Sequence, residues 1–202
     1  MDFVKEFAIF LQETGAIKFG NFKLSSGKES AYYVDLRIVP SFPHQFRRMI
    51  KHLQGDISEK VGLDSFDFIA SVPTSGLVIA SALAIETVKP LAYIRQKPKE
   101  YGTSSLIEGK MREGSKVLLV DDVGTTGQSI IKAVRALKEA KMSVVDAFVV
   151  INRLEGASEA LAADGVRLHE VTDVMKISSA LYGEGMLDEG TFDRIKKQMA
   201  AP

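Results

Sequence analysis

The chain has 202 residues, 46% of them hydrophobic, and its 26 basic residues are balanced by 26 acidic ones. This balance argues against a nucleic-acid or membrane-surface protein, because such proteins usually carry a basic excess. The lack of cysteine excludes disulfides and zinc–thiolate sites, and three histidines argue against a histidine-rich metal site. The sequence shows no signal peptide and no apolar run of the roughly 20 residues that a membrane span needs. We therefore expect a soluble, cytoplasmic protein with one sizeable core.

The first 40 residues predict a helix followed by a small β element. A stripe of phenylalanine and leucine residues indicates an amphipathic helix over residues 2–14. Apolar and polar residues then alternate between Gly15 and Gly27, which is typical of a short hairpin, and a strand follows over residues 31–38. We expect these elements to form a small N-terminal hood before the main fold.

Strands and helices alternate along the rest of the chain. The predicted strands cover residues 66–72, 91–95, 117–120, 143–151 and 167–171. The predicted helices cover residues 43–61, 77–88, a segment after residue 127, residues 157–163 and the C-terminal segments. This order predicts an α/β fold with a mostly parallel central sheet and helices on both faces.

The most informative stretch joins a strand to a helix through an acidic pair. The buried strand 117–120 gives way to Asp121 and Asp122, and a loop of small residues, 124–127, leads into the helix. A helix N-terminus, a glycine backbone and threonine hydroxyls together suit a phosphate. The carboxylates would repel that phosphate, but they can accept hydrogen bonds from sugar hydroxyls or hold a divalent metal through its water. The stretch therefore indicates a phosphorylated ribose, with an acidic turn before a capped helix as the structural alternative.

Three further segments follow predicted strands, where open α/β sheets bind their ligands. Thr74 and Ser75 lie in a turn that can bind an anion, although an ordinary βα turn is the alternative. The polar stretch 96–114 is too long for an ordinary connection and suits a lid, with a charged surface hairpin as the alternative. Arg153 can grip a carboxylate in a bidentate manner, or it can form a surface salt bridge.

The stretch from residue 117 to residue 130 resembles the signature of the type I phosphoribosyltransferases, which binds 5-phosphoribosyl pyrophosphate (PRPP). Other segments resemble the orotate phosphoribosyltransferases. Residues 17–27 are similar to their N-terminal Lys-Phe-Gly-x-Phe-x-Leu-x-Ser-Gly run, although several members carry a lysine where this chain has Ser25. The resemblance covers nearly the whole chain and implies one phosphoribosyltransferase domain over residues 1–202, with residues 1–40 forming the helix and hood.

The catalytic loop of that family typically reads Arg-Lys-x-x-Lys-x-His-Gly, and this chain matches it at Arg95, Lys99 and Gly102. Gln96 replaces a lysine of the pattern, and Tyr101 replaces its histidine. An Asp-Arg-x-Glu-Gly turn that supplies an arginine to the pyrimidine is matched at Arg153, where Asn152 replaces the acid.

The resemblance implies transfer of the phosphoribosyl group from PRPP to orotate in pyrimidine biosynthesis. It assigns catalysis to Lys99, Arg95, Asp121 and Asp122. It assigns PRPP binding to Arg95, Lys99, Tyr101, Asp121, Asp122, Val123, Gly124, Thr125, Thr126, Gly127, Gln128, Ser129, Thr74 and Ser75. It assigns orotate binding to Thr125, Arg153, Tyr33 and Val34. It also implies Mg²⁺ held mainly by PRPP, and a homodimer whose catalytic loop reaches the neighbouring active site.

Two alternatives remain open at this point. The first is a phosphoribosyltransferase for another base, such as a purine. The second is a regulator that responds to PRPP and keeps the fold without catalysis. The balanced charge argues against a regulator that binds nucleic acid, and the lysine of the polar loop favours an enzyme.

Overall fold

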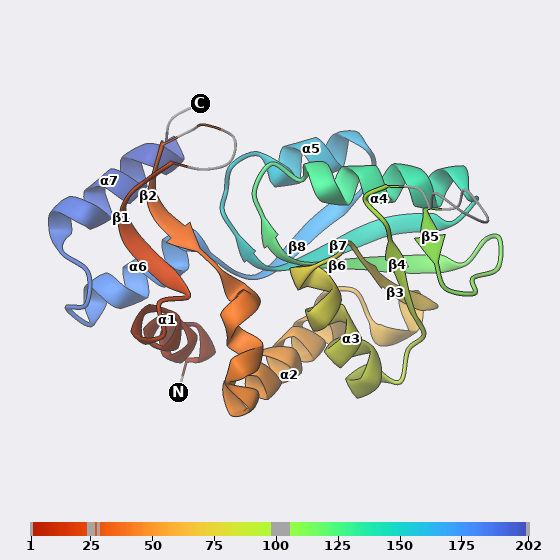
Figure 1. Cartoon of the computed structure of the whole chain (residues 1–202), viewed down its shortest axis with the longest axis horizontal. Helices are drawn as coiled ribbons and strands as arrows, with labels where there is room; N and C mark the ends of the chain where they lie inside the picture. The colour runs from red at the N-terminus through yellow and green to blue at the C-terminus, as the bar shows by residue number, and fades with distance from the viewer. Residues whose placement is uncertain (1, 24–26, 28, 98–105, 201–202) are drawn as a thin grey trace. The chain divides into compact units, whose positions relative to one another are not determined.

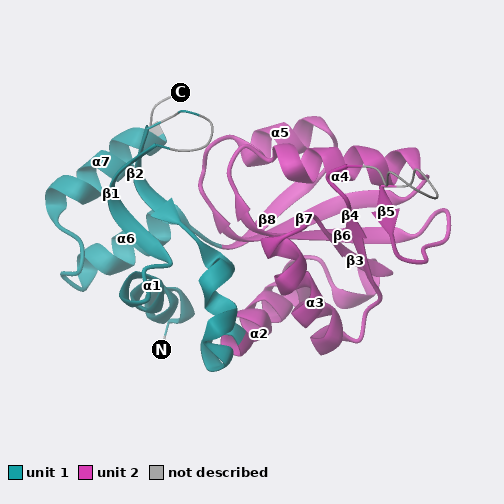
Figure 2. Ribbon diagram, viewed as in Figure 1, with its two compact units in different colours: residues 1–46, 172–202 teal, residues 47–171 magenta. Residues whose placement is uncertain are grey.

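The alternating strands and helices are present in the computed structural model, which describes residues 2–23, 27, 29–97 and 106–200 (Figure 1). The chain divides into two compact units, one of residues 1–46 and 172–202 and the other of residues 47–171 (Figure 2). None of the helices in the described part of the chain is long and apolar enough to cross a membrane.

The larger unit is built on a six-stranded sheet with the strand order β5-β4-β3-β6-β7-β8. Its strands are β3 (Phe68–Ser71), β4 (Leu91–Ile94), β5 (Ile107–Glu108), β6 (Lys116–Gly124), β7 (Ser143–Asn152) and β8 (Arg167–Asp173). Strands β4, β3, β6 and β7 run parallel to one another, and β5 pairs antiparallel with β4 at one edge. The predicted α/β class with a mostly parallel sheet is therefore confirmed.

Helices cover both faces of this sheet. They are α2 (Pro43–Lys60), α3 (Ser75–Thr87), α4 (Gln128–Glu139) and α5 (Ala157–Ala163), with a short 3₁₀ turn η2 (Leu63–Ser65) before β3. Helices α4 and α5 lie on one face, and α2 and α3 lie on the other (Figure 1). The central strands are consequently buried on both sides, and residues 147–151 of β7 have no exposed surface. The helical spacing predicted after residue 127 is confirmed, because Ile130, Val134 and Leu137 all face the core.

The smaller unit combines both ends of the chain. It contains α1 (Phe3–Glu13), β1 (Ile17–Lys23), β2 (Glu29–Val34), the 3₁₀ helix η1 (Leu36–Ser41), α6 (Val174–Gly183) and α7 (Glu189–Ala200). Asp2 begins α1 by accepting the N–H of Val4 on its side chain at 3.0 Å. Helix α7 is fixed to β2 by the side chain of Gln198, which accepts the N–H of Ala31 at 2.8 Å.

The predicted hairpin within residues 15–27 is wrong in its extent. Residues 17–23 form a single strand, and its antiparallel partner is β2, with Ile17 opposite Val34. The predicted strand over residues 31–38 is also too long. It ends at Val34, because the side chain of Asp35 accepts the N–H of Arg37 at 3.0 Å and begins η1.

Candidate functional site

The acidic pair lies at the carboxyl end of the central strand β6. The sequence predicted that the strand ends before the pair, at residue 120, but the strand is longer. It continues to Gly124, with Asp121 opposite Val149 and Gly124 opposite Asn152 of β7. Because β3, β6 and β7 are parallel, the turns that follow all three strands lie at the same edge of the sheet.

The carboxylate of Asp121 is half-buried and crowded. Its Oδ1 accepts the N–H of Asp122 at 2.9 Å, and Gly76 in the first turn of α3 lies directly against it. Burial raises the pKa of Asp121 well above its ordinary value, and the neighbouring charge of Asp122 raises it further. Among the residues that the structure describes, neither carboxylate forms an ion pair. The pair therefore favours a ligand that supplies hydroxyl donors or positive charge.

The small-residue loop after β6 forms a cavity of about 90 Å³. Its lining consists of Asp121, Val123, Gly124, Thr125, Thr126, Gly127, Gln128, Ser129 and Ile130. Gly127 has a φ of +74° and accepts the N–H of Ile131 on its carbonyl at 2.8 Å, so α4 begins directly after it. The first N–H groups of α4 have no partners within the helix, which makes this cavity suitable for a phosphate. All seven residues predicted from Val123 to Ser129 line it.

The turn after β3 lies beside the end of β4. The Nε2 atom of Gln96 donates a hydrogen bond to the carbonyl of Pro73 at 3.1 Å, and the peptide bond between Pro73 and Thr74 is cis. A cavity of about 450 Å³ opens here, lined by Pro73, Thr74, Tyr93, Arg95, Gln96 and Lys97. The predicted residues Thr74 and Arg95 thus share one cavity. Ser75 begins α3 and does not line it.

Arg95 is held at the start of the long polar stretch. Its Nε donates to the carbonyl of Lys97 at 3.3 Å, and its Nη1 lies 3.5 Å from a carboxylate oxygen of Glu108. The predicted polar stretch leaves β4 and returns to pair with it as β5, with Ile94 opposite Ile107. Lys99, Tyr101 and Ser25 lie outside the described residues.

Arg153 is buried, with 5% of its surface exposed. Its Nη2 lies 2.8 Å from Oε1 of Glu155, and its backbone N–H donates to the carbonyl of Gly124 at 2.8 Å. The turn that carries Arg153 is thereby joined to the phosphate-type loop that begins at Thr125. Its Nε also donates to Oε1 of Glu155 at 2.9 Å, so Glu155 holds the buried guanidinium, and a part for Arg153 in orotate binding stays a prediction.

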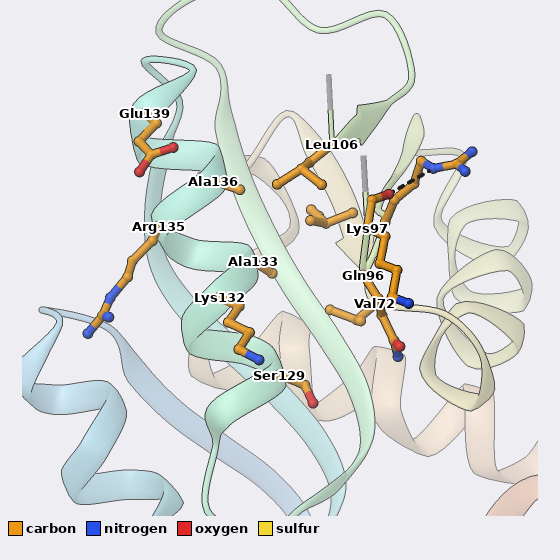
Figure 3. A pocket seen from close by; sticks show the side chains of 12 residues that line it. Val72, Gln96, Lys97, Leu106, Ser129, Lys132, Ala133, Arg135, Ala136 and Glu139 are labelled. Atoms are coloured by element: carbon orange, nitrogen blue, oxygen red, sulfur yellow. Dashed lines mark hydrogen bonds between the residues drawn. The ribbon is translucent and has the colours of Figure 1, made fainter. Parts of the chain in front are cut away.

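A third cavity, of about 490 Å³, lies between α4 and the end of β4 (Figure 3). Leu106, Ala133 and Ala136 form part of its apolar wall, and Lys132 of α4 lies at its rim. Arg135 points away from it and pairs with Asp164 at 3.0 Å. This cavity shares Arg95 and Ser129 with the predicted site.

Tyr33 and Val34, predicted to bind orotate, belong to β2 of the smaller unit. The hydroxyl of Tyr33 accepts a hydrogen bond from Arg37 at 3.3 Å, and its ring packs on Phe22 with centroids 5.8 Å apart. Their part in the site stays a prediction.

Sequence reasoning assigned no role to three residues that border the candidate site. Tyr93 lines the cavity at Thr74, and Gln96 fixes the turn beside it. Gly76 has no side chain, which lets α3 pack directly against Asp121 of β6. The only available signal was the position of Tyr93 two residues before Arg95, on a strand whose side chains alternate between faces.

Comparison of the chain with protein families, curated relatives and solved structures finds phosphoribosyltransferases in each case. The model of the phosphoribosyl transferase domain family matches residues 43–178. The orotate phosphoribosyltransferase of Cenarchaeum symbiosum (strain A) is 51% identical over 187 residues, which are 93% of this chain and 94% of that protein. The orotate phosphoribosyltransferase of Pyrococcus furiosus is 42% identical over 176 residues, 87% of this chain and 96% of that protein. The crystal structure of orotate phosphoribosyltransferase from Aeropyrum pernix is similar with a TM-score of 0.78 at 35% identity, covering 90% of this chain and 99% of that one.

Proposed function

Because the chain belongs to the orotate phosphoribosyltransferase family, we propose a role for each of its site residues in the transfer reaction. The reaction joins a ring nitrogen of orotate to the anomeric carbon of PRPP. It releases pyrophosphate and gives orotidine 5′-monophosphate, in pyrimidine biosynthesis. The main support for these roles is the hydrogen bond from the N–H of Arg153 to the carbonyl of Gly124. This bond joins the turn that carries Arg153 to the loop proposed to bind phosphate.

PRPP offers three groups of different charge, and the site offers three matching surfaces. The loop from Val123 to Ser129 receives the 5′-phosphate on backbone N–H groups and hydroxyls. Asp121 and Asp122 accept hydrogen bonds from the ribose hydroxyls. The diphosphate is bound by Thr74 and Arg95, which share one cavity. Ser75, Lys99 and Tyr101 also bind it in this proposal, on the basis of the sequence alone.

Orotate is bound through its carboxylate and ring by Arg153 and Thr125. Support comes from the position of Arg153: Glu155 orients its guanidinium, and its backbone N–H bonds to Gly124, next to Thr125. Tyr33 and Val34 also contribute to orotate binding in this proposal, on the basis of the sequence alone.

Catalysis rests on positioning and electrostatics. Positive charge develops on the ribose as pyrophosphate leaves, and the carboxylates of Asp121 and Asp122 stabilise it. Orotate is already an anion, so the attack needs no strong base. Arg95 and Lys99 neutralise the charge on the leaving group. Holding both substrates at one sheet edge supplies the remaining lowering of the barrier.

The residues present fit a magnesium ion that is held mainly by PRPP. Within the described part of the chain, no group of three His, Cys, Asp or Glu side chains could hold a metal by itself. The two carboxylates, both half-buried and without an ion pair among the described residues, would hold the ion through its water. When bound, the ion neutralises charge on the diphosphate oxygens.

We further propose that both compact units act as one phosphoribosyltransferase domain over residues 1–202, located in the cytoplasm. The family match supports this, because residues 43–178 cover the whole larger unit and extend at both ends into the smaller one. The highly charged PRPP does not cross membranes, so the enzyme must act in the compartment that makes it.

We also propose a homodimer whose catalytic loop reaches the neighbouring site. Support comes from the apolar helix α3 and the residue that follows it, where Val78, Ile85 and Val88 are exposed at 43%, 82% and 88%. An apolar face of this kind is typical of a protein–protein contact.

An assay with several bases tests the proposed function. The full chain is incubated with PRPP and Mg²⁺, and the loss of orotate absorbance is followed, with adenine, hypoxanthine, xanthine and uracil as controls. We expect turnover of orotate alone. Faster turnover of a purine would assign the chain to another base, and PRPP binding without any turnover would favour a regulator.

A further inference from the structure

Asn152 is the last residue of β7, and it stands where the family's turn carries an acid. It is buried, with 2% of its surface exposed. Its Oδ1 accepts the N–H of Leu154 at 2.9 Å. Its Nδ2 donates to Oε2 of Glu170 on the neighbouring strand β8 and to Oγ of Ser158, both at 3.4 Å. One side chain thus connects the arginine turn to β8 and α5.

The turn that Asn152 holds has an uncommon backbone. Leu154 has a φ of +58°, a left-handed conformation that residues with a branched apolar side chain seldom adopt. A side-chain acceptor two residues earlier stabilises such a turn by binding the N–H of the strained residue. Arg153 lies between these two residues, so the bond from Asn152 to Leu154 limits the orientations of its backbone.

An amide suits this position better than an acid because of Glu170. An aspartate at position 152 would keep an oxygen for the N–H of Leu154. Its second oxygen, however, would stand about 3.4 Å from the Glu170 carboxylate, where Asn152 now presents a donor. Two like charges this close in a buried region are costly.

We propose that Asn152, fixed by Glu170, is a positioning residue for orotate recognition, because it sets the turn from which Arg153 reaches the pyrimidine. This inference rests on the proposed binding of orotate by Arg153. Asn152 itself touches neither substrate. Its contribution is expected in the KM for orotate and not in the KM for PRPP, whose binding surfaces follow β3, β4 and β6.

The test compares Asn152→Asp, Glu170→Gln and the double variant. We expect Asn152→Asp to raise the KM for orotate about tenfold and to change the KM for PRPP less than about twofold. Glu170→Gln alone should have little effect, since its carbonyl oxygen still accepts from Asn152. The double variant should regain most of the affinity, because position 170 then carries no charge and its new amide can donate to the new carboxylate. Asn21→Asp is the matched control, since Asn21 is exposed in the smaller unit and accepts a hydrogen bond from Arg194 at 2.9 Å.

A pH series adds a readout that general destabilisation would not produce. The ratio of the KM for orotate of Asn152→Asp to that of the unmodified chain should decrease as the pH is lowered from about 8 to about 5. At the lower pH the two neighbouring carboxyl groups share a proton and no longer repel each other. Asn152→Ala adds no charge, so it should raise the KM for orotate without responding to pH or to Glu170→Gln. This variant also keeps the test decisive if Asn152→Asp does not fold.

Arg153→Lys separates the positioning role of Asn152 from the proposed function. If it raises the KM for orotate while Asn152→Asp and Asn152→Ala do not, the positioning role is wrong and the proposed function stands. If Arg153→Lys leaves the KM for orotate unchanged, the proposed role of Arg153 fails. Equal increases in both KM values for the Asn152 variants would also overturn the proposal, because they would indicate general damage to the site.

Discussion

Gly76, in the first turn of α3, lies so close to Asp121 of β6 that no side chain fits between them. A methyl group at Gly76 would lie 2.7 Å from Oγ of Ser71 and 3.0 Å from Cα of Asp121. The second of these is backbone in the middle of a sheet, which cannot move aside cheaply. Helix and strand therefore approach at a distance that only glycine allows.

Gly76→Ala should lower both stability and turnover. We expect the free energy of unfolding to fall by about 1–3 kcal/mol, the usual cost of an overpacked core. Turnover should fall about tenfold, because the added methyl group displaces Asp121. Urea unfolding and initial rates measure the two effects. Gly55→Ala on α2 is the control, because nothing lies within 4 Å of the added methyl, and it should stabilise the protein by about 0.5–1 kcal/mol. Similar results for both variants would refute the crowding.

Asp121→Asn should separate stability from activity. Burial raises the pKa of Asp121 in the folded state above the unfolded value of 3.8, so the native protein loses stability as the pH rises from that value through the folded pKa. The variant lacks this loss. Its melting temperature relative to the native protein should therefore be higher at pH 7 than at about pH 4, by roughly 2–4 °C for each kcal/mol regained.

The same variant should lower kcat/KM for PRPP by about 10- to 100-fold, because a charged acceptor of sugar hydroxyls is lost. Asp64→Asn is the control, since Asp64 is exposed and its loss should change neither quantity. A stability gain that is the same at both pH values would contradict the burial of the Asp121 charge.

Gln96 links the end of β4 to the turn at Pro73, and its loss should weaken PRPP binding. We expect Gln96→Ala to raise the KM for PRPP about threefold, because a single exposed hydrogen bond is lost. Gln96→Glu should raise it further, since a carboxylate would enter a cavity proposed to hold a diphosphate. Steady-state kinetics at several ionic strengths distinguish the two, and an equal increase in both variants would argue against an anion in this cavity.

Removal of metal should abolish turnover without changing the free protein. A chelator should stop the reaction, and Mg²⁺ should restore it, since the proposed ion is held mainly by PRPP. Thermal unfolding without PRPP should be the same with and without Mg²⁺, in keeping with the absence of a three-ligand cluster among the described residues. A clear rise in melting temperature from Mg²⁺ alone would indicate a metal site of the protein's own.

Lys99 is predicted from the sequence to act on the leaving pyrophosphate. Lys99→Ala should therefore lower turnover by about 100-fold or more, and far more than it weakens orotate binding. Lys110→Ala, which removes a lysine from the same polar stretch, serves as the control. Comparable losses in turnover and in orotate affinity would count against the assigned role.

The order of elements could be predicted because each depends on local periodicity. The apolar runs at Val117 and Ser143 and the helical spacing after Gly127 all correspond to observed elements. Strand ends were less predictable, since they depend on partners. The change from apolar to acidic residues at Asp121 predicted the end of a strand, yet the ladder with β7 extends β6 to Gly124.

The part of the candidate site that lies in one short loop could be predicted, because its residue types by themselves indicate the chemistry. Acids, hydroxyls and glycines in one short loop indicate a phosphorylated ribose without knowledge of the fold. The contacts of Gly76 and Gln96 could not be predicted, because they join residues from different strands and helices. The hairpin was misplaced for a similar reason, since alternation within one strand does not identify its partner.

The extension of β6 to Gly124 decides how the acidic pair can move. In this part of β6, Asp121, Val123 and Gly124 are paired with residues of β7 in the central sheet. Opening this part of the chain requires breaking the central sheet, so amide hydrogen exchange at these positions should follow global unfolding, unlike exchange in loops. The acidic pair, which we propose to bind the ribose hydroxyls, is then held as rigidly as the core of the sheet.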